Sequence, residues 1–481
     1  MLNMAEGIAR LDTLTRSPVV AELARAFAAA GHDLAIVGGP VRDALLGRET
    51  HDLDFTTDAR PDDILRIVAP LSTAHWEIGR EFGTIGARIR DTATGVAEQV
   101  EITTFRADSY DGTTRKPTVE FGDRLEDDLV RRDFTVNAMA LRVPGRTLVD
   151  PTGGVEDLIA RRLRTPVDPA ISFGDDPLRM LRAARFASQL EFDVDPATVA
   201  AMTRLHETLE IVSPERIQGE LVRLLQTDDP VRGIRLLVDT GLMAQFLPEI
   251  PALRLEVDEH HHHKDVYEHS LTVLRQAIEL DRERHPDAAP DVTLRLAALL
   301  HDIGKPSTRK LEPGGTVTFH HHDVRGSRMA RKRLRELRFD AATTDAVSLL
   351  IELHLRFFGY AEGVWTDSAV RRYVRDAGPE LERLHILTRA DVTTRNRRKA
   401  ATLSSAYDDI ERRIAELREQ EELDAMRPEL DGNRIQEVLG IPPGREVGEA
   451  YRFLLDLRLD EGLLGADVAE RRLREWWAAR A

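Results

Sequence analysis

The chain has 481 residues, of which 42% are hydrophobic and 31% charged, and its net charge at pH 7 is −16. This composition predicts a soluble globular protein of several domains, and the negative charge argues against a generally basic nucleic-acid coat. The absence of cysteine excludes disulfides and thiolate metal sites, and without an apolar run of about 18 residues or an apolar signal core we expect a cytoplasmic protein.

The first part of the chain alternates helical and strand-like segments. Residues 1–32 predict an N-terminal helix, amphipathic over 18–31 and ending at a glycine. Short β-rich runs alternate with helical patterns further along, which predicts an α/β head domain with mostly one sheet over 33–165. The expected strands lie at 34–37, 53–55, 84–89, 100–105, 119–121 and 140–143.

Helical patterns dominate the remainder. We expect a neck or RNA-binding domain over 166–255, a second helical domain over 256–400 and a tail over 401–481. The predicted fold class is α+β, an α/β head followed by all-helical regions, although 315–319 gives a short strand signal. Residues 256–264, with four consecutive histidines, predict a polar linker, and 424–432 predicts another boundary.

Two glycines and two aspartates form the most informative motif. Gly38 and Gly39 follow an apolar run, and Asp52 and Asp54 lie on the next extended segment. Carboxylates at i and i+2 of a strand point to one face, where they could hold divalent cations. Mg²⁺ binds one or two carboxylates together with substrate phosphates, and glycines at a helix start let backbone N–H groups approach a triphosphate. The combination resembles the nucleotidyltransferase superfamily that includes DNA polymerase beta.

Two arginine motifs follow. R-R-D-F-T-V-N-A at 131–138 could bind phosphates bidentately, and the alternative is a solvated helix start capped by Asp133. In D-D-P-L-R-M-L-R-A-A-R-F at 175–186, a charged residue recurs every third position and forms an oblique stripe on a helix. A carboxylate and a guanidinium one turn apart could read a base edge, and the alternative is a salt-bridged surface helix. The stripe consists of Asp176, Arg179, Arg182 and Arg185.

Taken in order, these motifs resemble those of class II CCA-adding tRNA nucleotidyltransferases. D-P-T-G-G at 150–154 and the helical motif that runs from S-P-E-R-I at 213–217 to Glu220 complete the set, which covers about residues 33–250. The resemblance implies a head, neck, body and tail, and the addition of C, C and A to the 3′ end of tRNA without a nucleic-acid template. The implied partners are tRNA, CTP and ATP, with neither DNA nor a membrane, and the oligomeric state stays open.

The resemblance also implies roles for individual residues. Asp175 stands where the family usually has glutamate, and Glu101 is a candidate accessory carboxylate. Asp52 and Asp54 would be catalytic and would bind Mg²⁺, whereas the triphosphate would be contacted by Gly39, Arg42 and Arg132. The base would be read by Asp176 and Arg179, and the nucleotide would be supported by Arg182 and Arg185.

Related enzymes share this head, so the motifs leave alternatives open. Poly(A) polymerases carry the same paired aspartates, and partial enzymes add only CC or only A. I-G-R-E-F-G at 78–83 resembles the CCA-adding version. The polar, glycine-bearing segment 106–117 resembles the flexible loop of CCA- and A-adding members.

An ordered set of histidines and aspartates between residues 265 and 391 resembles the HD phosphohydrolase superfamily. Imidazole and carboxylate ligands suit Mg²⁺ or a transition metal such as Ni²⁺, Co²⁺ or Mn²⁺. The resemblance implies phosphomonoesterase or 2′,3′-cyclic phosphodiesterase chemistry, or retention of the fold for tRNA docking alone. An HD phosphohydrolase with a non-catalytic head is the alternative of another class. The core ligands would be His269, His301, Asp302 and Asp391, with His322 and His354 as additional ligands.

Overall fold

The computed structural model describes residues 4–49, 53–77, 79–90, 95, 97–106, 121–255, 265–313, 317–357, 360, 365–393, 396–421 and 427–480. The chain forms two compact units, Met1–Pro248 and Glu249–Ala481, each of which has its own core. The predicted α+β fold class is confirmed. Within the described ranges, no helix is long and apolar enough to cross a membrane.

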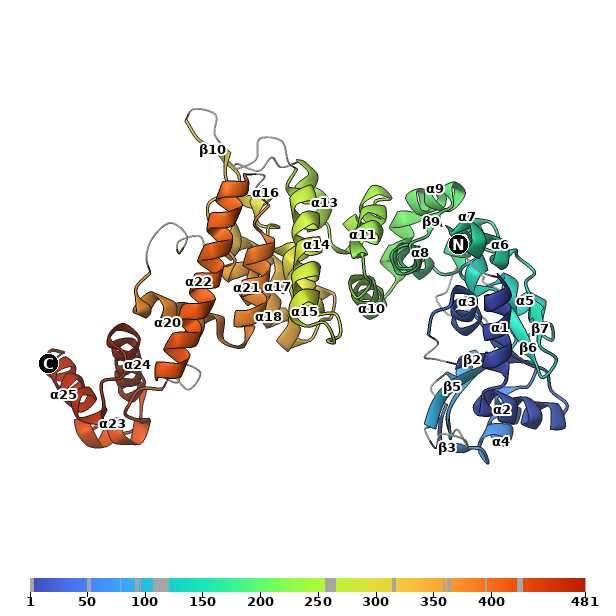
Figure 1. Ribbon diagram of the computed structural model, residues 1–481, viewed down its shortest axis with the longest axis horizontal. Helices are drawn as coiled ribbons and strands as arrows, with labels where there is room; N and C mark the ends of the chain where they lie inside the picture. The colour runs from blue at the N-terminus through green and yellow to red at the C-terminus, as the bar shows by residue number, and fades with distance from the viewer. Residues whose placement is uncertain are drawn as a thin grey trace. The chain divides into compact units, whose positions relative to one another are not determined.

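A mixed sheet of seven strands forms the centre of the first unit (Figure 1). The strands are β1 (Leu34–Val37), β2 (Leu53–Thr57), β3 (Ser72–Trp76), β4 (Thr84–Arg90), β5 (Ala97–Thr104), β6 (Ala140–Val143) and β7 (Thr147–Val149). Their spatial order is β3-β4-β5-β2-β1-β6-β7. β2 and β5 pair in parallel, and the other pairs are antiparallel.

The N-terminal segment folds as two helices, α1 (Met4–Thr15) and α2 (Pro18–Ala29). α2 confirms the amphipathic helix expected over 18–31, and α1 precedes it as a separate helix. The break has a local cause. Ser17 caps α2 by accepting a hydrogen bond from the backbone N–H of Val20 over 3.3 Å, and Pro18 occupies the first turn, where its missing N–H costs no helical bond.

Short helices cover and extend the sheet. α2 contacts β1 and β6, and α4 (Pro61–Val68) contacts β4 and β5. Leu125 and Leu129 of α5 (Leu125–Val130) pack with Ala35 and Val37 of β1 in a buried cluster. The short 3₁₀ helices are η1 (Arg80–Phe82) and η2 (Thr135–Asn137).

The helices after residue 150 start at strong local signals. Asp168, Asp195 and Asp229 each cap a helix whose first residue is proline. α8 packs against α10 and α11. The helices are α6 (Gly154–Ala160), α7 (Pro169–Asp175), α8 (Leu178–Leu190), α9 (Pro196–Leu205), η3 (His206–Ile211), α10 (Pro214–Leu225), α11 (Pro230–Asp239) and α12 (Leu242–Phe246).

The second unit is a helical assembly centred on α15. This helix contacts α14, α18 and α21, and residues 294–300 are all buried. The helices are α13 (Glu249–Ala252), η4 (Leu253–Leu255), α14 (Val266–Arg284), α15 (Val292–Leu300), α16 (Lys305–Thr308), α17 (His322–Glu336), α18 (Ala341–Leu353), α20 (Asp367–Ala377), η5 (Gly378–Glu380), α21 (Leu381–Ala390) and α22 (Arg397–Glu421).

The last helices form a small core of their own. Ile435, Leu454 and Leu473 belong to one buried cluster, which is shared by α23 (Gly432–Leu439), α24 (Arg445–Glu461) and α25 (Ala466–Ala478). Arg371 of α20 donates from Nη1 to the carbonyl of Leu459 over 3.2 Å. This contact ties the tail helices to the rest of the second unit.

The regions after residue 165 are not entirely helical, contrary to the sequence prediction. β9 (Asp193–Val194) pairs in parallel with β8 (Arg162–Leu163) at the end of the predicted head, and β10 (Lys310–Leu311) pairs with β11 (Val317–Thr318) near the strand signal at 315–319. The predicted linker at 256–264 lies outside the described residues. The finer domain boundaries stay predictions.

Candidate functional sites

The predicted glycine pair forms the turn between β1 and α3 (Gly39–Leu46). Gly38 has φ +74° and ψ −125°, a conformation that residues with side chains rarely adopt. A Cβ on Gly38 would lie 3.4 Å from a terminal nitrogen of Arg132, so glycine also lets Arg132 lie against the turn. The first N–H groups of α3 have no helical acceptors, which suits an anionic group such as a triphosphate.

Asp54 lies on β2, the central strand of the sheet. The parallel register places Asp54 opposite Glu101 of β5. Paired residues on neighbouring strands project to the same face of a sheet, so these two carboxylates share a face. Glu101 therefore lies where an accessory carboxylate could act. Asp52, the other predicted catalytic residue, lies outside the described residues.

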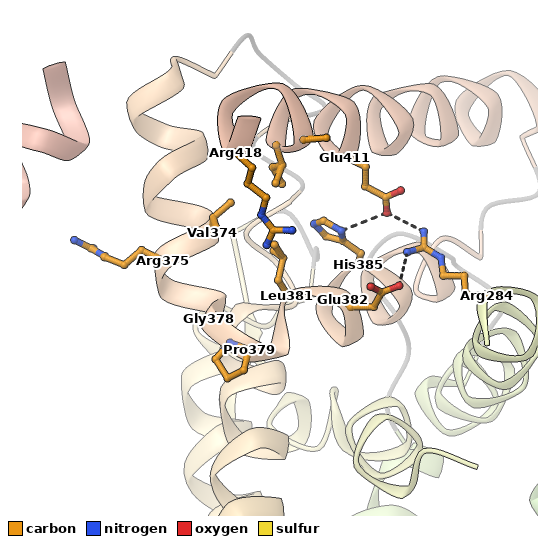
Figure 2. Close-up of a pocket in the computed structure, with 12 residues that line it drawn as sticks. Arg284, Val374, Arg375, Gly378, Pro379, Leu381, Glu382, His385, Glu411 and Arg418 are labelled. Carbon is orange, nitrogen blue, oxygen red and sulfur yellow. Dashed lines mark hydrogen bonds and ion pairs between the residues drawn. The ribbon is translucent and has the colours of Figure 1, made fainter. Parts of the chain in front are cut away.

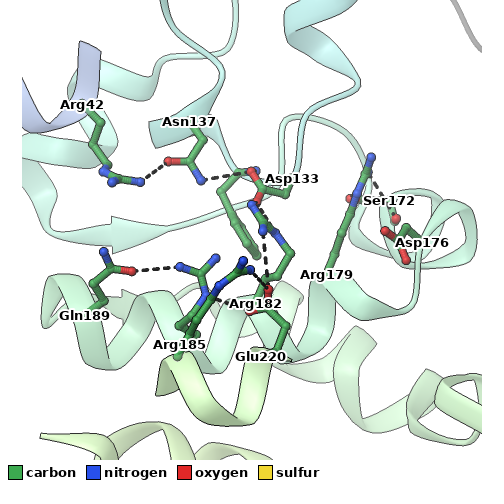
Figure 3. Close-up of polar contacts among 12 residues, drawn as sticks. Arg42, Asp133, Asn137, Ser172, Asp176, Arg179, Arg182, Arg185, Gln189 and Glu220 are labelled. Carbon is green, nitrogen blue, oxygen red and sulfur yellow. Dashed lines mark hydrogen bonds and ion pairs between the residues drawn. The ribbon is translucent and has the colours of Figure 1, made fainter. Parts of the chain in front are cut away.

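A chain of hydrogen bonds joins α3 to α8 (Figure 3). Arg42 donates from Nη1 to Oδ1 of Asn137 over 2.6 Å, and Asn137 donates from Nδ2 to Oδ1 of Asp133 over 3.0 Å. The other oxygen of Asp133 accepts from Nε of Arg182 over 2.8 Å. Arg42 also donates two hydrogen bonds to Asp43. The glycine turn and the α8 stripe are therefore parts of one polar network.

Asp133 is the ionised centre of this chain. Burial alone would raise its pKa, but the charge of Arg182 and the hydrogen bonds from Asn137 and Arg182 outweigh burial and lower the pKa to about 2. The alternative that Asp133 merely caps a solvated helix start is wrong, because its side chain is buried between the two motifs.

The arginine stripe on α8 is largely buried. Arg179 and Arg185 are each 9% exposed. The alternative of a salt-bridged surface helix is therefore wrong in placing this helix at the surface, although Arg185 does pair with a carboxylate. Arg185 donates from Nε to Glu220 over 2.7 Å and from Nη1 to Gln189 over 2.9 Å. Glu220, on α10, is itself only 3% exposed. Arg182 and Arg223 also lie within 3.7 and 3.2 Å of this buried carboxylate, which therefore offsets the charge of three arginines.

The predicted base-reading residues are held by neighbouring groups. Oδ2 of Asp176 lies 2.9 Å from Nη2 of Arg216 on α10. Arg179 donates from Nη1 to Oγ of Ser172 over 2.9 Å and from Nη2 to the carbonyl of Arg131 over 2.7 Å. A base that donates to Asp176 therefore competes with Arg216 for one oxygen. Asp175, the departure from the family pattern, ends α7.

One cavity of about 450 Å³ unites these residues. Its lining carries six arginines and three aspartates, an excess of positive charge that suits a triphosphate. Every predicted nucleotide-binding residue lies on it, together with Asp54. The predicted residues on this lining are Gly39, Arg42, Asp54, Arg132, Asp176, Arg179, Arg182 and Arg185.

The histidines and aspartates of the second unit converge into two ligand sets. Within each set, one ligand atom from each residue lies within 4.8 Å of the others. All six side chains are buried or nearly so, and they come from the ends of helices that pack around α15. The first set is His269, His301 and Asp391, and the second is Asp302, His322 and His354.

Asp302 connects the two sets. One of its oxygens lies 3.1 Å from Nε2 of His301, and the other lies 3.2 Å from Nε2 of His322. Lys305 also lies 3.0 Å from this carboxylate. The turn after Asp302 requires Gly304, because a Cβ there would lie 2.1 Å from the carbonyl oxygen of His322.

Backbone contacts orient three of the histidines. In each, Nδ1 contacts the carbonyl oxygen three residues earlier, and because a carbonyl only accepts, Nδ1 carries a proton and Nε2 faces the cluster. Nε2 of His354 has no hydrogen-bond partner within the described ranges, which fits a metal ligand. The contacts are His301 to Ala298 at 2.9 Å, His322 to Phe319 at 2.8 Å and His354 to Ile351 at 2.6 Å.

Charge is strongly coupled in this cluster. Burial lowers the pKa of His301, but Asp302 and Asp391 more than compensate and raise it to about 10. Burial alone would raise the pKa of Asp302, but the neighbouring His301 and Lys305 outweigh burial and lower this pKa well below its usual range. Burial and the neighbouring imidazoles lower the pKa of His354 to about 4, so this ring is neutral at pH 7 and able to bind a cation.

A separate cavity of about 920 Å³ lies between α20, α21 and α22 (Figure 2). Its charged residues satisfy one another. Glu411 accepts from Arg284 over 2.8 Å and lies 3.3 Å from Nδ1 of His385. Burial raises the pKa of Glu411, and hydrogen bonds from His385 and Arg284 lower it to about 2. The described lining contains none of the cluster's ligands.

Three protein families match successive parts of the chain. The family described as "Poly A polymerase head domain" matches residues 34–164. "Probable RNA and SrmB- binding site of polymerase A" matches 191–253, and "HD domain" matches 266–396. The three matches follow the order of the head motifs, the α9 to α13 helices and the histidine cluster.

Similarity to whole proteins identifies the family. An A-adding tRNA nucleotidyltransferase of Deinococcus radiodurans is 34% identical over 452 residues, which cover 92% of this chain and 95% of that protein. The chain belongs to the tRNA nucleotidyltransferase family. A CCA-adding enzyme of Levilactobacillus brevis is 41% identical over 230 residues, 48% of this chain and 55% of that protein. The crystal structure of the Bacillus stearothermophilus CCA-adding enzyme in complex with CTP has a TM-score of 0.65 and 25% identity, and the match covers 95% of this chain and 96% of that one.

Membership in the tRNA nucleotidyltransferase family confirms the resemblance predicted from the ordered head motifs, and the HD match confirms the second resemblance. Enzymes of this family depend on divalent metal ions. The roles assigned to individual residues stay predictions, although one cavity brings the described head residues together.

Sequence reasoning did not assign several residues of the tRNA nucleotidyltransferase cavity. The lining includes Asn137, Gln189 and Arg216, and Glu220 accepts a hydrogen bond from Arg185 without lining the cavity itself. Glu220 had a usable signal, since it lies on the otherwise apolar buried face of α10 and must therefore have a charged partner. Nothing in the local sequence indicated that its partner lies 35 residues away.

Proposed function

We propose that this tRNA nucleotidyltransferase completes the 3′ end of tRNA by adding C, C and A from CTP and ATP, with Mg²⁺ and without a nucleic-acid template. The cavity that joins the Gly38 turn and Asp54 to the α8 stripe carries the proposal. It offers groups for a triphosphate at one end and a carboxylate with guanidinium groups for a base at the other. We expect this reaction to take place in the cytoplasm.

The residues fit a direct nucleotidyl transfer. The 3′ hydroxyl of tRNA attacks the α-phosphate, a new P–O bond forms, the bond to the β-phosphate oxygen breaks, and pyrophosphate leaves. Asp52 and Asp54 would hold Mg²⁺, and the bound ion would supply activation of the hydroxyl and neutralisation of charge on the leaving group. The amide of Gly39, together with Arg42 and Arg132, would bind the triphosphate.

The base would be read at the other end of the cavity. Asp176 can accept a hydrogen bond from the exocyclic amine that cytosine and adenine share, and Arg179 can donate to a ring acceptor. Uracil and guanine present a carbonyl oxygen at the corresponding position, and a carbonyl cannot donate a hydrogen bond to the carboxylate of Asp176. This chemistry explains how one protein site could accept both CTP and ATP.

A second candidate is addition of A alone. The Deinococcus radiodurans relative that matches along nearly the whole chain is named an A-adding enzyme. The loop segment that resembles CCA- and A-adding members does not separate the two, and its residues after Arg106 lie outside the described ranges.

Product lengths separate the candidates. Purified protein is incubated with Mg²⁺, one labelled nucleotide at a time, and tRNAs that end before CCA, after C, or after CC. Ordered addition of two C and one A supports the proposal. Incorporation of a single A on the CC-ending tRNA only supports A addition, and long A tails indicate a poly(A) polymerase. Absence of incorporation would favour an HD phosphohydrolase with a non-catalytic head.

We also propose that the HD cluster binds a divalent metal and hydrolyses phosphoesters at damaged RNA ends, a step that would precede CCA addition. The two buried ligand sets bridged by Asp302 favour this activity. Their imidazole and carboxylate ligands suit Ni²⁺, Co²⁺ or Mn²⁺. Metal analysis of the purified protein, followed by assays on 2′,3′-cyclic nucleotides and on RNA with a 3′-phosphate, tests it. A fully reconstituted protein that neither holds such a metal nor hydrolyses either substrate would refute it.

A further inference from the structure

Asp128 lies on α5 and contacts Arg132, the arginine that lies against the Gly38 turn. Its side chain is buried and does not line the nucleotide cavity. Its carboxylate contacts three parts of the head. Oδ2 accepts from Nη2 of Arg132 over 3.1 Å and from Oγ1 of Thr56 over 3.4 Å, and Oδ1 accepts from the backbone N–H of Arg106 over 3.3 Å.

Each partner belongs to a different part of the catalytic region. Thr56 lies on β2, two residues after Asp54, so the two side chains leave the strand on the same face. Arg106 lies two residues after the end of β5, the strand that carries Glu101. Asp128 therefore links Arg132 to both strands that present the carboxylates.

The pair is not an ordinary surface contact between residues four apart on a helix. α5 ends at Val130, so Arg132 lies beyond the helix and its direction is not set by helical geometry. The Asp128 side chain is 6% exposed and that of Arg132 is 27% exposed. One end of the guanidinium is therefore anchored by a buried carboxylate, and Nη1 is left against the Gly38 turn.

We propose that Asp128 is a positioning residue for the triphosphate. It holds the guanidinium of Arg132 in the direction in which Nη1 can donate to a phosphate oxygen beside Gly38. This inference rests on the proposed nucleotide binding in the head. Because Arg132 would act at the phosphates and not at the base, loss of Asp128 should weaken CTP and ATP equally and leave the choice of base unchanged.

A purely structural role for Asp128 makes a different prediction. If the carboxylate only anchored α5, its loss would weaken binding of nucleoside triphosphates and monophosphates to the same extent. Asp127, its exposed neighbour on the same helix, provides a matched control, because its substitution removes an equal charge without touching Arg132.

The test is a double-mutant cycle read by calorimetric binding of CTP, ATP and CMP to the full-length protein. Asp128→Asn and Asp127→Asn are each made alone and with Arg132→Ala. Hydrogen bonds to charged groups predict that Asp128→Asn weakens CTP and ATP roughly ten- to a hundredfold. CMP binding and the effect of Asp127→Asn should change less than about twofold, and Asp128→Asn should add little once Arg132 is alanine.

Equal losses of CTP and CMP binding, or an undiminished effect in the Arg132→Ala background, would overturn the positioning role. If Asp128→Asn fails to fold, Asp128→Ser, whose short hydroxyl still accepts a hydrogen bond, enters the same cycle. Wild-type protein that binds no CTP would refute the proposed function itself. If wild-type protein binds CTP but the Asp128 variants bind it equally tightly, this inference alone is refuted.

Discussion

Arg182 places both Nε and Nη2 against the same oxygen of Asp133, at 2.8 and 2.6 Å. The two residues are 49 positions apart and belong to motifs that look like independent sites in the sequence. Phe134, next to Asp133, also meets Phe186 of α8 edge-on, with ring centroids 5.8 Å apart. The motif predicted to bind phosphate and the helix predicted to read the base are therefore held together by direct contacts.

Asp133→Asn should destabilise this clamp in a pH-dependent way. The pKa of Asp133 is lowered from its usual 3.8 to about 2, so the stabilisation is complete above about pH 4 and is lost as the pH falls through 2. Urea unfolding at pH 7 should show a loss of about 2 kcal/mol in the variant, and the difference from wild type should shrink towards pH 3. Asp127→Asn is the control. A difference that stays constant over this pH range would contradict the ionised pair.

Asp54→Ala should abolish nucleotide addition and leave tRNA affinity nearly intact, and Asp52→Ala should do the same. Loss of a metal-binding carboxylate should reduce turnover by at least about a thousandfold. Single-turnover incorporation measures the first effect, and gel-shift titration with tRNA measures the second. If Asp54→Ala incorporates nucleotides at the wild-type rate, the head cavity is not the catalytic site.

Glu101→Gln tests the carboxylate opposite Asp54 in the parallel register. If Glu101 assists metal binding, the variant should need a higher Mg²⁺ concentration for half-maximal rate, with a smaller loss than Asp54→Ala at saturation. Glu98→Gln, on the same strand, is the control. An unchanged Mg²⁺ dependence would leave Glu101 without a role in the reaction.

Arg179→Ala should lose discrimination against UTP and GTP more than it loses turnover, because one base-reading donor is worth about tenfold or more in selectivity. The structure adds that Arg179 also holds Ser172 and the carbonyl of Arg131, so the melting temperature should fall as well. Arg179→Lys keeps the charge but not the donor fork, and it should show the same relaxed selectivity with less destabilisation. Full selectivity in both variants would mean that this helix does not read the base.

Asp302→Ala should lose bound transition metal and any hydrolysis of 2′,3′-cyclic nucleotides, by more than about a hundredfold, while CCA addition continues. The reason is that Asp302 bridges both ligand sets and belongs to the second unit, whereas the nucleotide cavity belongs to the first. Asp323→Ala, one residue after His322, is the matched control. Joint loss of both activities in a folded variant would contradict two separate sites.

The sequence predicted the central strands well because their patterns are strongly apolar. β1 and β6 have the expected bounds, and both are buried. β3 and β7 were missed because both are edge strands with mostly exposed or half-buried residues, so neither carries the apolar alternation that marks a strand. Of the strand expected at 119–121, Phe121 is described and pairs with Arg106 in an isolated bridge.

The candidate site was predicted in its members but not in its connections. The recurrence of charged residues at every third position predicted the stripe on α8, because side chains three residues apart lie next to each other on a helix. Which partner each arginine takes depends on long-range packing: Arg182 meets Asp133, and Arg185 meets Glu220. The capture of Asp176 by Arg216 likewise has no local signal, since the two are 40 residues apart.

The carbonyl contacts that fix Nδ1 of His301, His322 and His354 come from residues only three positions earlier in the chain, in α15 and α18 for His301 and His354 and just before α17 for His322. Local backbone contacts therefore orient the three rings. If the cluster binds a metal ion as proposed, a site whose rings are already oriented has little means of rejecting an ion that accepts the same ligands. Its metal content would then follow the supply in the cell and the intrinsic order of metal affinities.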